Sequence, residues 1–266
     1  MNYSLAEPLL KLENVSLSFG EKENKKKVLR DINIEIKDII GETTTGQVVT
    51  LLGKSGAGKT TLLRIIAGLI QPTTGSVLIG KQQLPVVAGV VGMVLQTYPL
   101  FAHRTLMENL LLVCKDKAKI ESYLEDFDIY QHKDKYPSKL SGGQRQRTAI
   151  LQQLLCSEHY ILLDEPFSGL DPVAIEKLCK ILTKVVNADD QNTLIISSHI
   201  LEPSIAISDT IWMIGNEYDG DKKLEGSVIR YTEDLAAEGF AWNPEIRKDP
   251  KFRDAVERVR ELFHTL

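Results

Sequence analysis

Several features that would point to other classes of protein are scarce or missing in this 266-residue chain. Its three cysteines, Cys114, Cys156 and Cys179, form no CxxC pair, and we expect free, buried thiols instead of disulfides or metal ligands. Such cysteine usage suits a reducing cytoplasm. No apolar run reaches the ~20 residues that a membrane-spanning helix needs.

Basic residues are not in excess either. The chain has 32 Lys and Arg against 36 Asp and Glu, a formal net charge of −4, so we expect no nucleic-acid partner. The start, MNYSLAEPLL, has no basic segment followed by an apolar one, and we expect no signal peptide. Internal repeats and low-complexity tracts are also missing. What remains is ordinary for a globular protein, and the length fits one large α/β domain with or without a small appendage.

Hydrophobic periodicity predicts that short strands alternate with helices over most of the chain. The predicted strands are Leu9–Phe19, Val28–Ile36, Val48–Leu52, Val77–Ile79, Val90–Leu95, Tyr160–Leu163, Thr193–Ser197 and Thr210–Ile214. The predicted helices are Thr60–Ile70, Leu106–Val113, Ala118–Phe127, Gln144–Leu155, Val173–Val186 and Ile200–Ile207. Polar or charged loops are predicted at Gly20–Lys27, Asp38–Gly46 and Asp219–Lys223. This alternation predicts a parallel sheet with helices on both faces, and a helical subdomain at about 99–156 inserted between strands.

The C-terminal part, 216–266, is predicted to be an extension of a main domain that spans 9–215. Asp249 can cap a helix whose first residue is Pro250. Apolar residues then recur at helical spacing as far as Phe263, so we expect a helix near 250–264 that packs on the core. This helix can be a packing element only, or it can dimerise or sense a regulator.

A glycine-rich turn lies between the apolar strand Val48–Leu52 and the helix that starts near Thr60. It matches the phosphate-binding pattern G-x-x-x-x-G-K-[ST]. Its residues are Gly53, Lys54, Ser55, Gly56, Ala57, Gly58, Lys59 and Thr60, with Thr61 next in the helix. Glycines let the backbone wrap around phosphate, and N–H groups at the helix N-terminus point at its charge. We expect Lys59 to reach the β- and γ-phosphates of ATP and Thr60 to hold Mg²⁺, which together predict a P-loop NTPase.

Two acidic residues, Asp164 and Glu165, end the apolar strand that begins at Tyr160. Ligands of open α/β sheets bind at the carboxyl ends of strands, so we expect Asp164 beside the phosphate loop, where it orients Mg²⁺. Glu165 points the other way by strand alternation and can act as the general base that polarises a water for attack on the γ-phosphate. Without the phosphate loop, we would interpret the pair only as two solvent-exposed acidic residues at the end of a strand.

Two further polar residues follow neighbouring predicted strands. His199 can hydrogen-bond the γ-phosphate, and Gln96 can offer its amide to Mg²⁺ or to the attacking water. Each assignment would be weak by itself, because a lone histidine is usually structural. Together with the phosphate loop and the acidic pair, they complete a predicted site for ATP hydrolysis.

A second glycine motif, Leu140-Ser141-Gly142-Gly143-Gln144, precedes the predicted helix Gln144–Leu155. We expect Ser141 to be the N-cap, and the two glycines expose backbone N–H groups, which makes a second anion site. One ATP cannot occupy two distant sites in one chain. A head-to-tail dimer resolves this, because each γ-phosphate then lies between the phosphate loop of one copy and the Ser141 turn of the other.

Together these motifs resemble those of the ATP-binding subunits of ABC transporters. LSGGQ at 140–144 is similar to the family's signature, and the order of the motifs along residues 9–215 is also the family's. The resemblance implies an α/β fold with a P-loop NTPase (RecA-like) core, an N-terminal antiparallel β subdomain and an inserted α-helical signature subdomain. It also implies ATP and Mg²⁺ as ligands.

The resemblance further implies roles for residues that no pattern assigns. Phe19 matches the aromatic residue that stacks on adenine, although it can instead be a core residue at a strand end. Asp171 ends the loop Ser168–Asp171, which resembles the part that couples the two sites across the dimer. The stretch from Gln96 to Glu108 resembles the region that receives a coupling helix from a separate transmembrane permease.

The function that the resemblance implies is that of a cassette on the cytoplasmic face of a membrane, which hydrolyses ATP and energises solute transport by permease subunits. Through the permease it would also work with a solute-binding protein. LFAHRTLMENL after Gln96 and the tail EDLAAEGFAWNPEI resemble importer cassettes of the nitrate/sulfonate/taurine or polar amino-acid groups. The insertion-like stretch Asp38–Gly46 leaves the subgroup open. An exporter cassette, a soluble ABC ATPase without a transporter, and a small-molecule kinase are the alternatives, and the kinase leaves LSGGQ unexplained.

Overall fold

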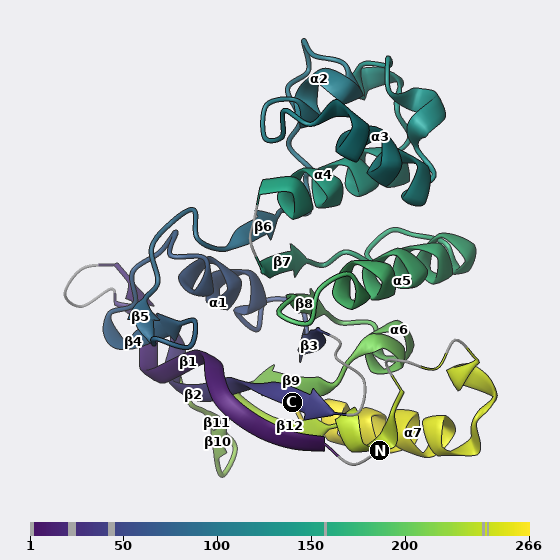
Figure 1. Cartoon of the computed structure of the whole chain (residues 1–266). Coiled ribbons are helices and arrows are strands. Elements are labelled where there is room, and N and C mark those ends of the chain that lie inside the picture. Colours follow the sequence, from purple (N-terminus) through teal and green to yellow (C-terminus); the bar gives the residue numbers. More distant parts are fainter. Residues whose placement is uncertain (1–2, 21–24, 42–45, 157–158, 241–242, 244) are drawn as a thin grey trace.

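The computed structural model describes residues 3–20, 25–41, 46–156, 159–240, 243 and 245–266. An N-terminal sheet lies on one side of a central α/β core, and a helical part rises from the opposite side (Figure 1). The C-terminal extension folds back beside the core, so that the yellow helix α7 lies far from the helical part. The chain therefore has the division into a β part, an α/β core and a helical insertion that the sequence predicts.

The N-terminal sheet has the strand order β2-β1-β4-β5. Its strands are β1 (Tyr3–Phe19), β2 (Lys26–Gly41), β4 (Thr74–Ile79) and β5 (Leu84–Pro85). All of the neighbouring strands pair antiparallel. Alternate apolar side chains of β1 and β2, such as those of Leu10, Leu12 and Ile36, are buried on the side of the core.

Two predicted loops are partly wrong because β2 is longer than its apolar pattern. Within Asp38–Gly46, residues 38–41 belong to β2, and Ile39–Gly41 pair with Tyr3–Leu5 at the start of β1. Within Gly20–Lys27, the two lysines at 26 and 27 also belong to β2. A ladder is made by backbone groups, so β2 continues beyond its regular apolar alternation, through the two lysines and through Ile39–Gly41, where β1 accompanies it. Residues 21–24 and 42–45 lie outside the described residues.

The main sheet has the order β12-β9-β3-β8-β7-β6. Its strands are β3 (Gln47–Leu52), β6 (Gly92–Val94), β7 (Tyr160–Asp164), β8 (Thr193–Ser198), β9 (Thr210–Gly215) and β12 (Val228–Asp234). The first five of these are parallel to their neighbours, and β12 adds an antiparallel strand beside β9. The carboxyl ends of β3, β6, β7 and β8 therefore meet at one edge, which is where open α/β sheets bind ligands.

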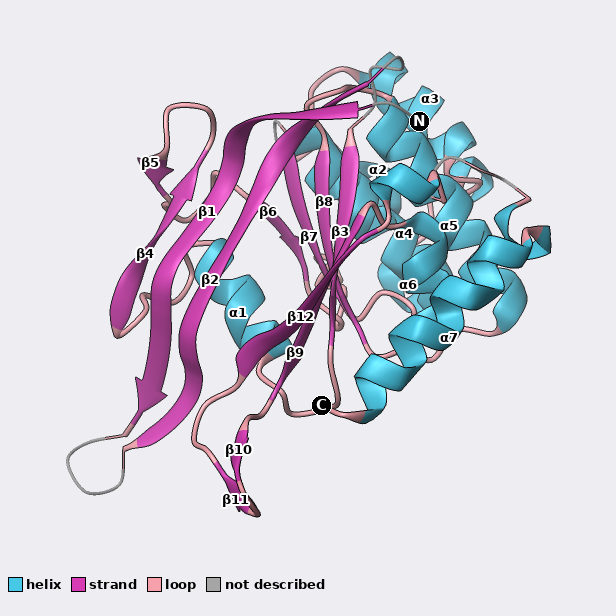
Figure 2. Cartoon of the chain, turned by 90° about the horizontal axis from the view of Figure 1, so that it is seen from below, coloured by secondary structure: helices cyan, strands magenta, loops and turns pink. Residues whose placement is uncertain are grey.

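Strand alternation divides the buried side chains of the main sheet between two faces. Leu162 and Ile195 pack with α1 (Lys59–Ile66) and the N-terminal sheet, whereas Leu163 and Ile196 pack with helices on the other face. Figure 2 shows α1 between the two sheets, with the remaining helices grouped on the opposite side of the main sheet. The predicted arrangement of helices on both faces is confirmed.

The helical part lies between β6 and β7 in the sequence. Its helices are α2 (Leu106–Leu110), α3 (Lys117–Asp126) and α4 (Gly142–Cys156), with 3₁₀ turns at Tyr130–His132 and Pro137–Lys139. Thr105 and Glu108 form a reciprocal capping box at the start of α2, and Asp116 caps α3. On the other side of β7, α5 (Pro172–Asn187) connects to β8 and α6 (Leu201–Ile207) connects to β9.

Some predicted elements are too long. The helix predicted at Thr60–Ile70 ends at Ile66, because Gly68 takes a left-handed conformation with φ of 70° just after it. The helix predicted at Leu106–Val113 ends at Leu110, and the strand predicted at Val90–Leu95 covers only Gly92–Val94. Apolar residues continue beyond these elements, and some of them, such as Ile70 and Leu111, pack on the core while others, such as Leu69 and Val90, are exposed, so periodicity alone does not mark the ends.

The C-terminal extension has more structure than the predicted helix. The predicted loop Asp219–Lys223 is a small hairpin of β10 (Tyr218–Asp219) and β11 (Lys222–Lys223), and β12 follows it. After 3₁₀ turns at Ala236–Glu238 and Ile246–Lys248 comes α7 (Pro250–His264). Asp249 caps α7 by accepting a hydrogen bond from Lys251 N at 2.9 Å, as the Asp-Pro pair predicts.

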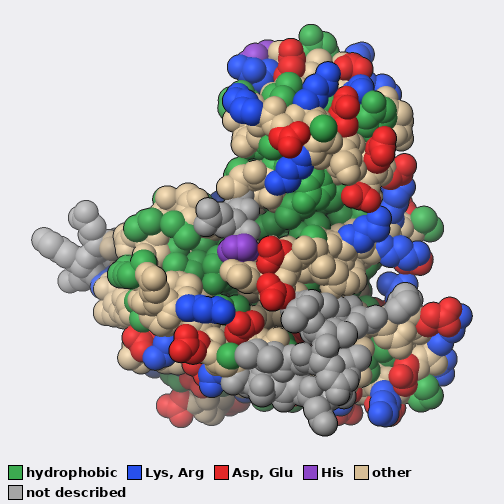
Figure 3. Space-filling view, viewed as in Figure 1, with side chains coloured by type: hydrophobic (Ala, Val, Ile, Leu, Met, Phe, Trp, Pro, Cys, Tyr) green, Lys and Arg blue, Asp and Glu red, His purple; other side chains and the backbone are tan. Residues whose placement is uncertain are grey.

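All three cysteines are free, but the expectation that they are buried is wrong for Cys156, which is exposed at the last turn of α4. Cys114 and Cys179 are half-buried. Among the described residues, no helix is long and apolar enough to cross a bilayer. On the face drawn in Figure 3, acidic and basic side chains are interspersed, without a broad basic area.

Candidate nucleotide-binding site

The phosphate-binding pattern lies between the carboxyl end of β3 and the start of α1. Gly56 and Gly58 have φ values of 79° and 91°, a conformation that glycine adopts with little strain. Gly53 is required for a different reason, since a Cβ there would lie 2.7 Å from the main-chain oxygen of Ile214. Gly58 is the N-cap of α1 and brings no side-chain cap, so no side chain competes with an anion for the first N–H groups of the helix.

The other residues of the loop differ in how far they are exposed to solvent. Ala57 is buried, and Ser55 is exposed. Thr61 is half-buried in the first turn of α1. Lys54 is largely exposed, yet its Nζ donates a hydrogen bond to the main-chain oxygen of Leu266, at 2.5 Å. This last contact was not expected from the sequence, because it joins the loop to the end of the extension.

Lys59 is a buried cation with three oxygen partners. Its side chain is 6% exposed, and Nζ donates to the main-chain oxygens of Gly53, at 2.8 Å, and Lys54, at 3.2 Å. Nζ also forms an ion pair with Oε1 of Glu165, at 2.9 Å. These contacts hold the ammonium group inside the turn, where the phosphate-binding pattern predicts it to act.

Asp164 and Thr60 are brought together as predicted for a magnesium site. Thr60 Oγ1 donates to the two carboxylate oxygens of Asp164, at 3.0 and 2.9 Å, and Asp164 is 6% exposed. Hydroxyl and carboxylate oxygens are the donors that Mg²⁺ prefers, so this pair fits the ion. Gln96 does not join the pair in this arrangement. It lies just past β6, and its Nε2 donates to Ser168 Oγ at 3.5 Å.

Glu165 directly follows β7, and its carboxylate lies between two groups from different elements. Oε1 pairs with Lys59, and Oε2 lies 2.8 Å from Nδ1 of His199, which follows β8. Glu165 has a φ of 49°, which is uncommon for a residue with a side chain. The predicted separation of the two acids is observed, since Asp164 contacts Thr60 while Glu165 contacts Lys59 and His199.

Ser197, near the end of β8, connects the two acidic residues and was not identified from the sequence. Its fully buried hydroxyl donates to Asp164 Oδ1 at 2.6 Å and accepts a hydrogen bond from Glu165 N at 2.9 Å. A second bond, from Glu165 N to the Ser197 main-chain oxygen, is 3.2 Å long. The signal in the sequence was a serine in an otherwise apolar strand, LIIS, because a buried hydroxyl needs partners.

The Ser141 turn begins α4 in the helical part, away from the phosphate loop (Figure 1). Gln144 N donates to Ser141 Oγ at 3.3 Å, and Ser141 N donates to Gln144 Oε1 at 2.9 Å, so the predicted cap is a reciprocal capping box. A Cβ added to Gly142 or Gly143 would meet no atom within 4 Å. None of the hydrogen bonds found for Ser141–Gln144 within the described residues reaches the phosphate loop, so one chain does not bring the two turns together.

Phe19 and Asp171 lie at the ends of elements. Phe19 is the last residue of β1 and is 49% exposed, so it is not the core residue that was the alternative. Asp171 is the N-cap of α5, and its Oδ1 accepts hydrogen bonds from Val173 N and Ala174 N, at 2.9 and 3.0 Å. The roles predicted for both residues, in adenine stacking and across a dimer, stay predictions.

Tyr98 and Gln146 link the Gln96 segment and α4 to the acidic strand end. Gln146 lies near the Tyr98 hydroxyl, and its Nε2 donates to the main-chain oxygen of Pro166 at 2.5 Å. Burial raises the pKa of the Tyr98 hydroxyl, and the negative charge of Asp164 raises it further. The nearby Gln146 amide lowers the pKa of Tyr98, but burial and the charge of Asp164 outweigh it.

Asn109 fixes the segment that the resemblance assigns to a permease contact, and it too was missed. Its fully buried amide accepts from Phe101 N at 2.8 Å and donates to the main-chain oxygens of Phe101, Arg104 and Thr105. Phe101 itself is 53% exposed and makes an edge contact with the ring of His103. A polar residue on the apolar face of LMENL was the signal for this buried anchor.

Comparison with known proteins places the chain in a family. The family model described as ABC transporter matches residues 36–168. The chain is 34% identical over 247 residues to the uncharacterized ABC transporter ATP-binding protein YtlC of Bacillus subtilis, and the match covers 90% of this chain and 92% of that protein. The chain belongs to the ABC transporter family. It is an ATP-binding and ATP-hydrolysing cassette of that family, with the P-loop NTPase fold.

Other relatives of this ABC cassette are named as import proteins. It is 35% identical over 77% of its length to the sulfate/thiosulfate import ATP-binding protein CysA of Synechocystis. It is 37% identical over 76% of its length to the spermidine/putrescine import ATP-binding protein PotA of Spiroplasma citri. The chain spans only 58% of the length of each of these two relatives.

Solved structures agree with the ABC fold. The dimeric cassette MJ0796, bound to ADP and Pi, superposes with a TM-score of 0.68 at 26% identity, and covers 85% of this chain and 98% of that one. The cbiO1 protein of Clostridium perfringens, at 23% identity, superposes with a TM-score of 0.70 over 96% of this chain and all of its own length. The second likeness concerns the fold alone.

Proposed function

We propose that this chain is the energy-supplying cassette of an ABC importer. In this proposal it lies on the cytoplasmic face of the membrane, works as a head-to-tail dimer and drives a separate permease. The names of the relatives favour import over export, since the sulfate/thiosulfate and spermidine/putrescine proteins are both import ATP-binding proteins. The observation that carries the proposal is the position of the Glu165 carboxylate, held between Lys59 and His199 and next to the Asp164–Thr60 pair.

Each predicted residue has a place in the proposed hydrolysis. The backbone N–H groups of 53–60 bind the phosphates of ATP, and Phe19 stacks on the adenine. Thr60, Asp164 and Gln96 hold Mg²⁺, which neutralises charge on the phosphates when it is bound. The present contact of Gln96 with Ser168 is long, at 3.5 Å, so little is lost when its amide turns toward the ion.

The ion pair between Lys59 and Glu165 gives the proposal a defined order of events. Lys59 has one ammonium group, and a γ-phosphate competes for it with the Glu165 carboxylate. When phosphate takes Lys59, the carboxylate is released to accept a proton from the attacking water. His199 keeps the carboxylate oriented through Oε2, and in this proposal it also contacts the γ-phosphate. In this way the binding of ATP frees Glu165 to act as the general base.

The Ser141 turn supplies the second half of the proposed site. The open face of Gly142 and Gly143 leaves the N-terminus of α4 accessible to a phosphate from outside the chain. In a head-to-tail dimer that phosphate belongs to ATP on the partner's phosphate loop, and Asp171 lies near the shared boundary. The segment 96–108, anchored by Asn109, is the proposed contact for the permease, and through the permease the cassette would serve a solute-binding protein.

The substitution Glu165→Gln tests the central residue. We expect ATP binding to persist and the hydrolysis rate to fall about 100-fold or more, since a general base contributes roughly that much. A dimer should accumulate in the presence of ATP, measured by size-exclusion chromatography with light scattering. Glu176→Gln, an exposed glutamate on α5 that pairs with Lys180, is the matched control and should leave turnover unchanged. Undiminished hydrolysis by the Glu165→Gln protein would remove Glu165 from the role of base.

A further inference from the structure

The C-terminal extension reaches back to the phosphate loop through its last described residue. The main-chain oxygen of Leu266 accepts a hydrogen bond from Lys54 Nζ, and Leu266 is only 7% exposed. Lys54 is the second residue of the loop, and its own main-chain oxygen receives Lys59 Nζ at 3.2 Å. Lys54 therefore bonds to both parts of the structure: its main-chain oxygen binds the buried Lys59, and its side chain binds the C-terminal extension.

Close packing around Gly215 also fixes Leu266 beside the phosphate loop. A Cβ added to Gly215, the last residue of β9, would lie 2.9 Å from a side-chain carbon of Leu266 and 3.2 Å from its Cα. The preceding residue, Ile214, approaches Gly53 so closely that a Cβ there would lie 2.7 Å away. The end of β9 is thus packed between the first glycine of the phosphate loop and Leu266, with no room for side chains on either glycine.

Leu266 has a fixed position because the rest of the extension is tied down. Phe252, Val256 and Val259 of α7 share one buried cluster with Leu52, the residue just before the loop. Arg258 of α7 pairs with Glu233, at 2.9 Å, and with Glu238, at 2.7 Å, which joins the helix to β12 and to the turn after it. Thr265 Oγ1 lies 2.9 Å from the hydroxyl of Tyr231 in β12.

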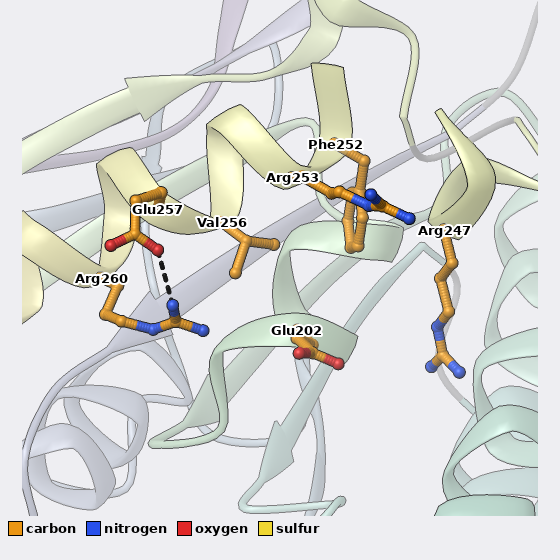
Figure 4. A pocket seen from close by; sticks show the side chains of 7 residues that line it. All are labelled: Glu202, Arg247, Phe252, Arg253, Val256, Glu257 and Arg260. Atoms are coloured by element: carbon orange, nitrogen blue, oxygen red, sulfur yellow. Dashed lines mark hydrogen bonds and ion pairs between the residues drawn. The ribbon is translucent and has the colours of Figure 1, made fainter. Parts of the chain in front are cut away.

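Helix α7 also covers α6, the helix that begins two residues after His199. Figure 4 shows the pocket between these helices, with Phe252 and Val256 extending from α7 and Glu202 of α6 across from them. Charged side chains surround this apolar contact, and Arg260 pairs with Glu257 at 2.6 Å. The extension therefore touches two elements of the nucleotide site, the phosphate loop directly and the His199 segment through α6.

From these contacts we propose that Leu266 is a positioning residue of the nucleotide site, and that through it the extension sets the affinity of the phosphate loop for ATP. A loop that is ordered before binding loses less conformational entropy when the nucleotide arrives. The Lys54–Leu266 bond, together with the packing of Leu266 on Gly215, provides such ordering. The contact lies outside the reacting groups, so it acts on binding and not on the chemical step. The inference rests on the assignment of residues 53–60 as the phosphate loop.

The test is a set of four proteins that isolates the bond between Lys54 and Leu266. They are the wild type, a chain that ends at His264, Lys54→Met, and the shortened chain that also carries Lys54→Met. Dissociation constants for a fluorescent ATP analogue, KM and kcat are measured for each. Thr265→Ala in the full chain is the matched control, because shortening also removes the Thr265–Tyr231 contact. Binding by the wild type tests the proposed function separately.

We expect the chain that ends at His264 to bind nucleotide about fivefold more weakly, with a matching rise in KM and kcat within about twofold, since one hydrogen bond to a charged group is lost. In the Lys54→Met protein the same shortening should weaken binding by only about twofold, because the bond is already gone and only the packing of Leu266 on Gly215 remains to be lost. Equal effects in both backgrounds, an effect on kcat alone, or unchanged affinity would overturn the proposal.

Leu266→Ala keeps the proposal testable if the shortened chain fails to fold. This substitution retains the main-chain oxygen and removes only the packing on Gly215. We expect it to weaken binding by about twofold, less than the shortened chain, because the hydrogen bond that it keeps is the larger contribution. Unchanged binding by Leu266→Ala, in a protein whose thermal unfolding midpoint has fallen, would show that Leu266 has only a structural role and would contradict the proposal.

Discussion

The phosphate loop and the Ser141 turn are both glycine-rich starts of helices, but the chain uses them in opposite ways. The phosphate loop is enclosed by its own chain, with Lys59 buried and bonded to Gly53, Lys54 and Glu165. The Ser141 turn is exposed, caps itself through Gln144 and has open space beside Gly142. The polar groups of the phosphate loop are bonded within the chain, whereas the Ser141 turn leaves its helix N-terminus open to a group from outside the chain. Two similar motifs of the same chain therefore have different structural roles.

The largest expected effect is a difference in nucleotide affinity between a substitution in the phosphate loop and one in the Ser141 turn. Lys59→Met should weaken nucleotide binding about 100-fold, because a charged donor to phosphate is lost, whereas Ser141→Asp should leave binding to the single chain within about twofold. Both should reduce hydrolysis by about 100-fold or more, since Ser141→Asp places a negative charge where the partner's phosphate must approach. Equilibrium binding of a fluorescent analogue and phosphate release measure the two quantities.

Ser141→Thr is the control for that comparison, because it keeps a hydroxyl that can cap α4. Its hydrolysis should stay close to that of the wild type. If Ser141→Asp weakened binding to the isolated monomer as much as Lys59→Met does, the two turns would not be independent, and the head-to-tail arrangement would lose its main support.

A second, smaller effect concerns the buried hydroxyl that holds the acidic pair. Ser197→Ala removes the bond to Asp164 and one of the two bonds to Glu165 N. We expect hydrolysis to fall about tenfold at saturating ATP and Mg²⁺, with ATP affinity nearly unchanged, since one hydrogen bond to a charged group is worth roughly that much. Ser197→Thr retains the hydroxyl and should restore part of the rate. A loss of ATP affinity equal to the loss of rate would show that Ser197 supports the fold instead.

Matched glycine substitutions extend the comparison to stability. Gly58→Ala places a Cβ 3.0 Å from a side-chain carbon of Leu29 at a φ of 91°, and should lower the free energy of unfolding by about 1–2 kcal/mol. Gly142→Ala meets open space in the first turn of α4 and should change it by less than about 0.5 kcal/mol. Urea unfolding of both proteins measures the difference. Equal losses would mean that the Ser141 turn is as constrained as the phosphate loop.

The smallest effect is a difference in thiol reactivity between the helical part and the core. Burial raises the pKa of the Cys179 thiol to about 12, so it remains protonated and unreactive at pH 8, while Cys156 is exposed. Iodoacetamide at pH 8 should therefore modify Cys156 first and Cys179 last, as followed by peptide mass spectrometry. Raising the pH toward 10 should still leave Cys179 largely unmodified, and early labelling of Cys179 would mean that α5 opens locally.

Much of the fold follows from the sequence because the central strands are apolar runs bounded by glycine or acidic residues, as in Val48–Leu52 and Tyr160–Leu163. The ends of elements do not follow, since polar residues of β2 continue a ladder with β1 that only the fold provides. Likewise, β12 has half-buried and exposed residues but no fully buried ones and gives little periodic signal, although it completes one edge of the main sheet.

The candidate site shows the same limit. Asp164, Glu165 and His199 were identified because they end strands that meet at one edge of the sheet, which is a property of local sequence and topology. Ser197 and Asn109 act through buried hydrogen bonds to residues that are distant in sequence or in a neighbouring loop. The contact of Lys54 with Leu266 joins residues 212 positions apart, so no local sequence pattern predicts it.

The antiparallel strand β12 has a practical consequence for where this protein can be divided. It supplies hydrogen-bonding partners to one whole side of β9, from Thr210 to Gly215. A shortened cassette that stopped at Gly215 would leave a row of unpaired amide and carbonyl groups along an apolar strand, which is the kind of edge that recruits other chains into aggregates. A minimal soluble ATPase from this sequence therefore has to include at least Asp234.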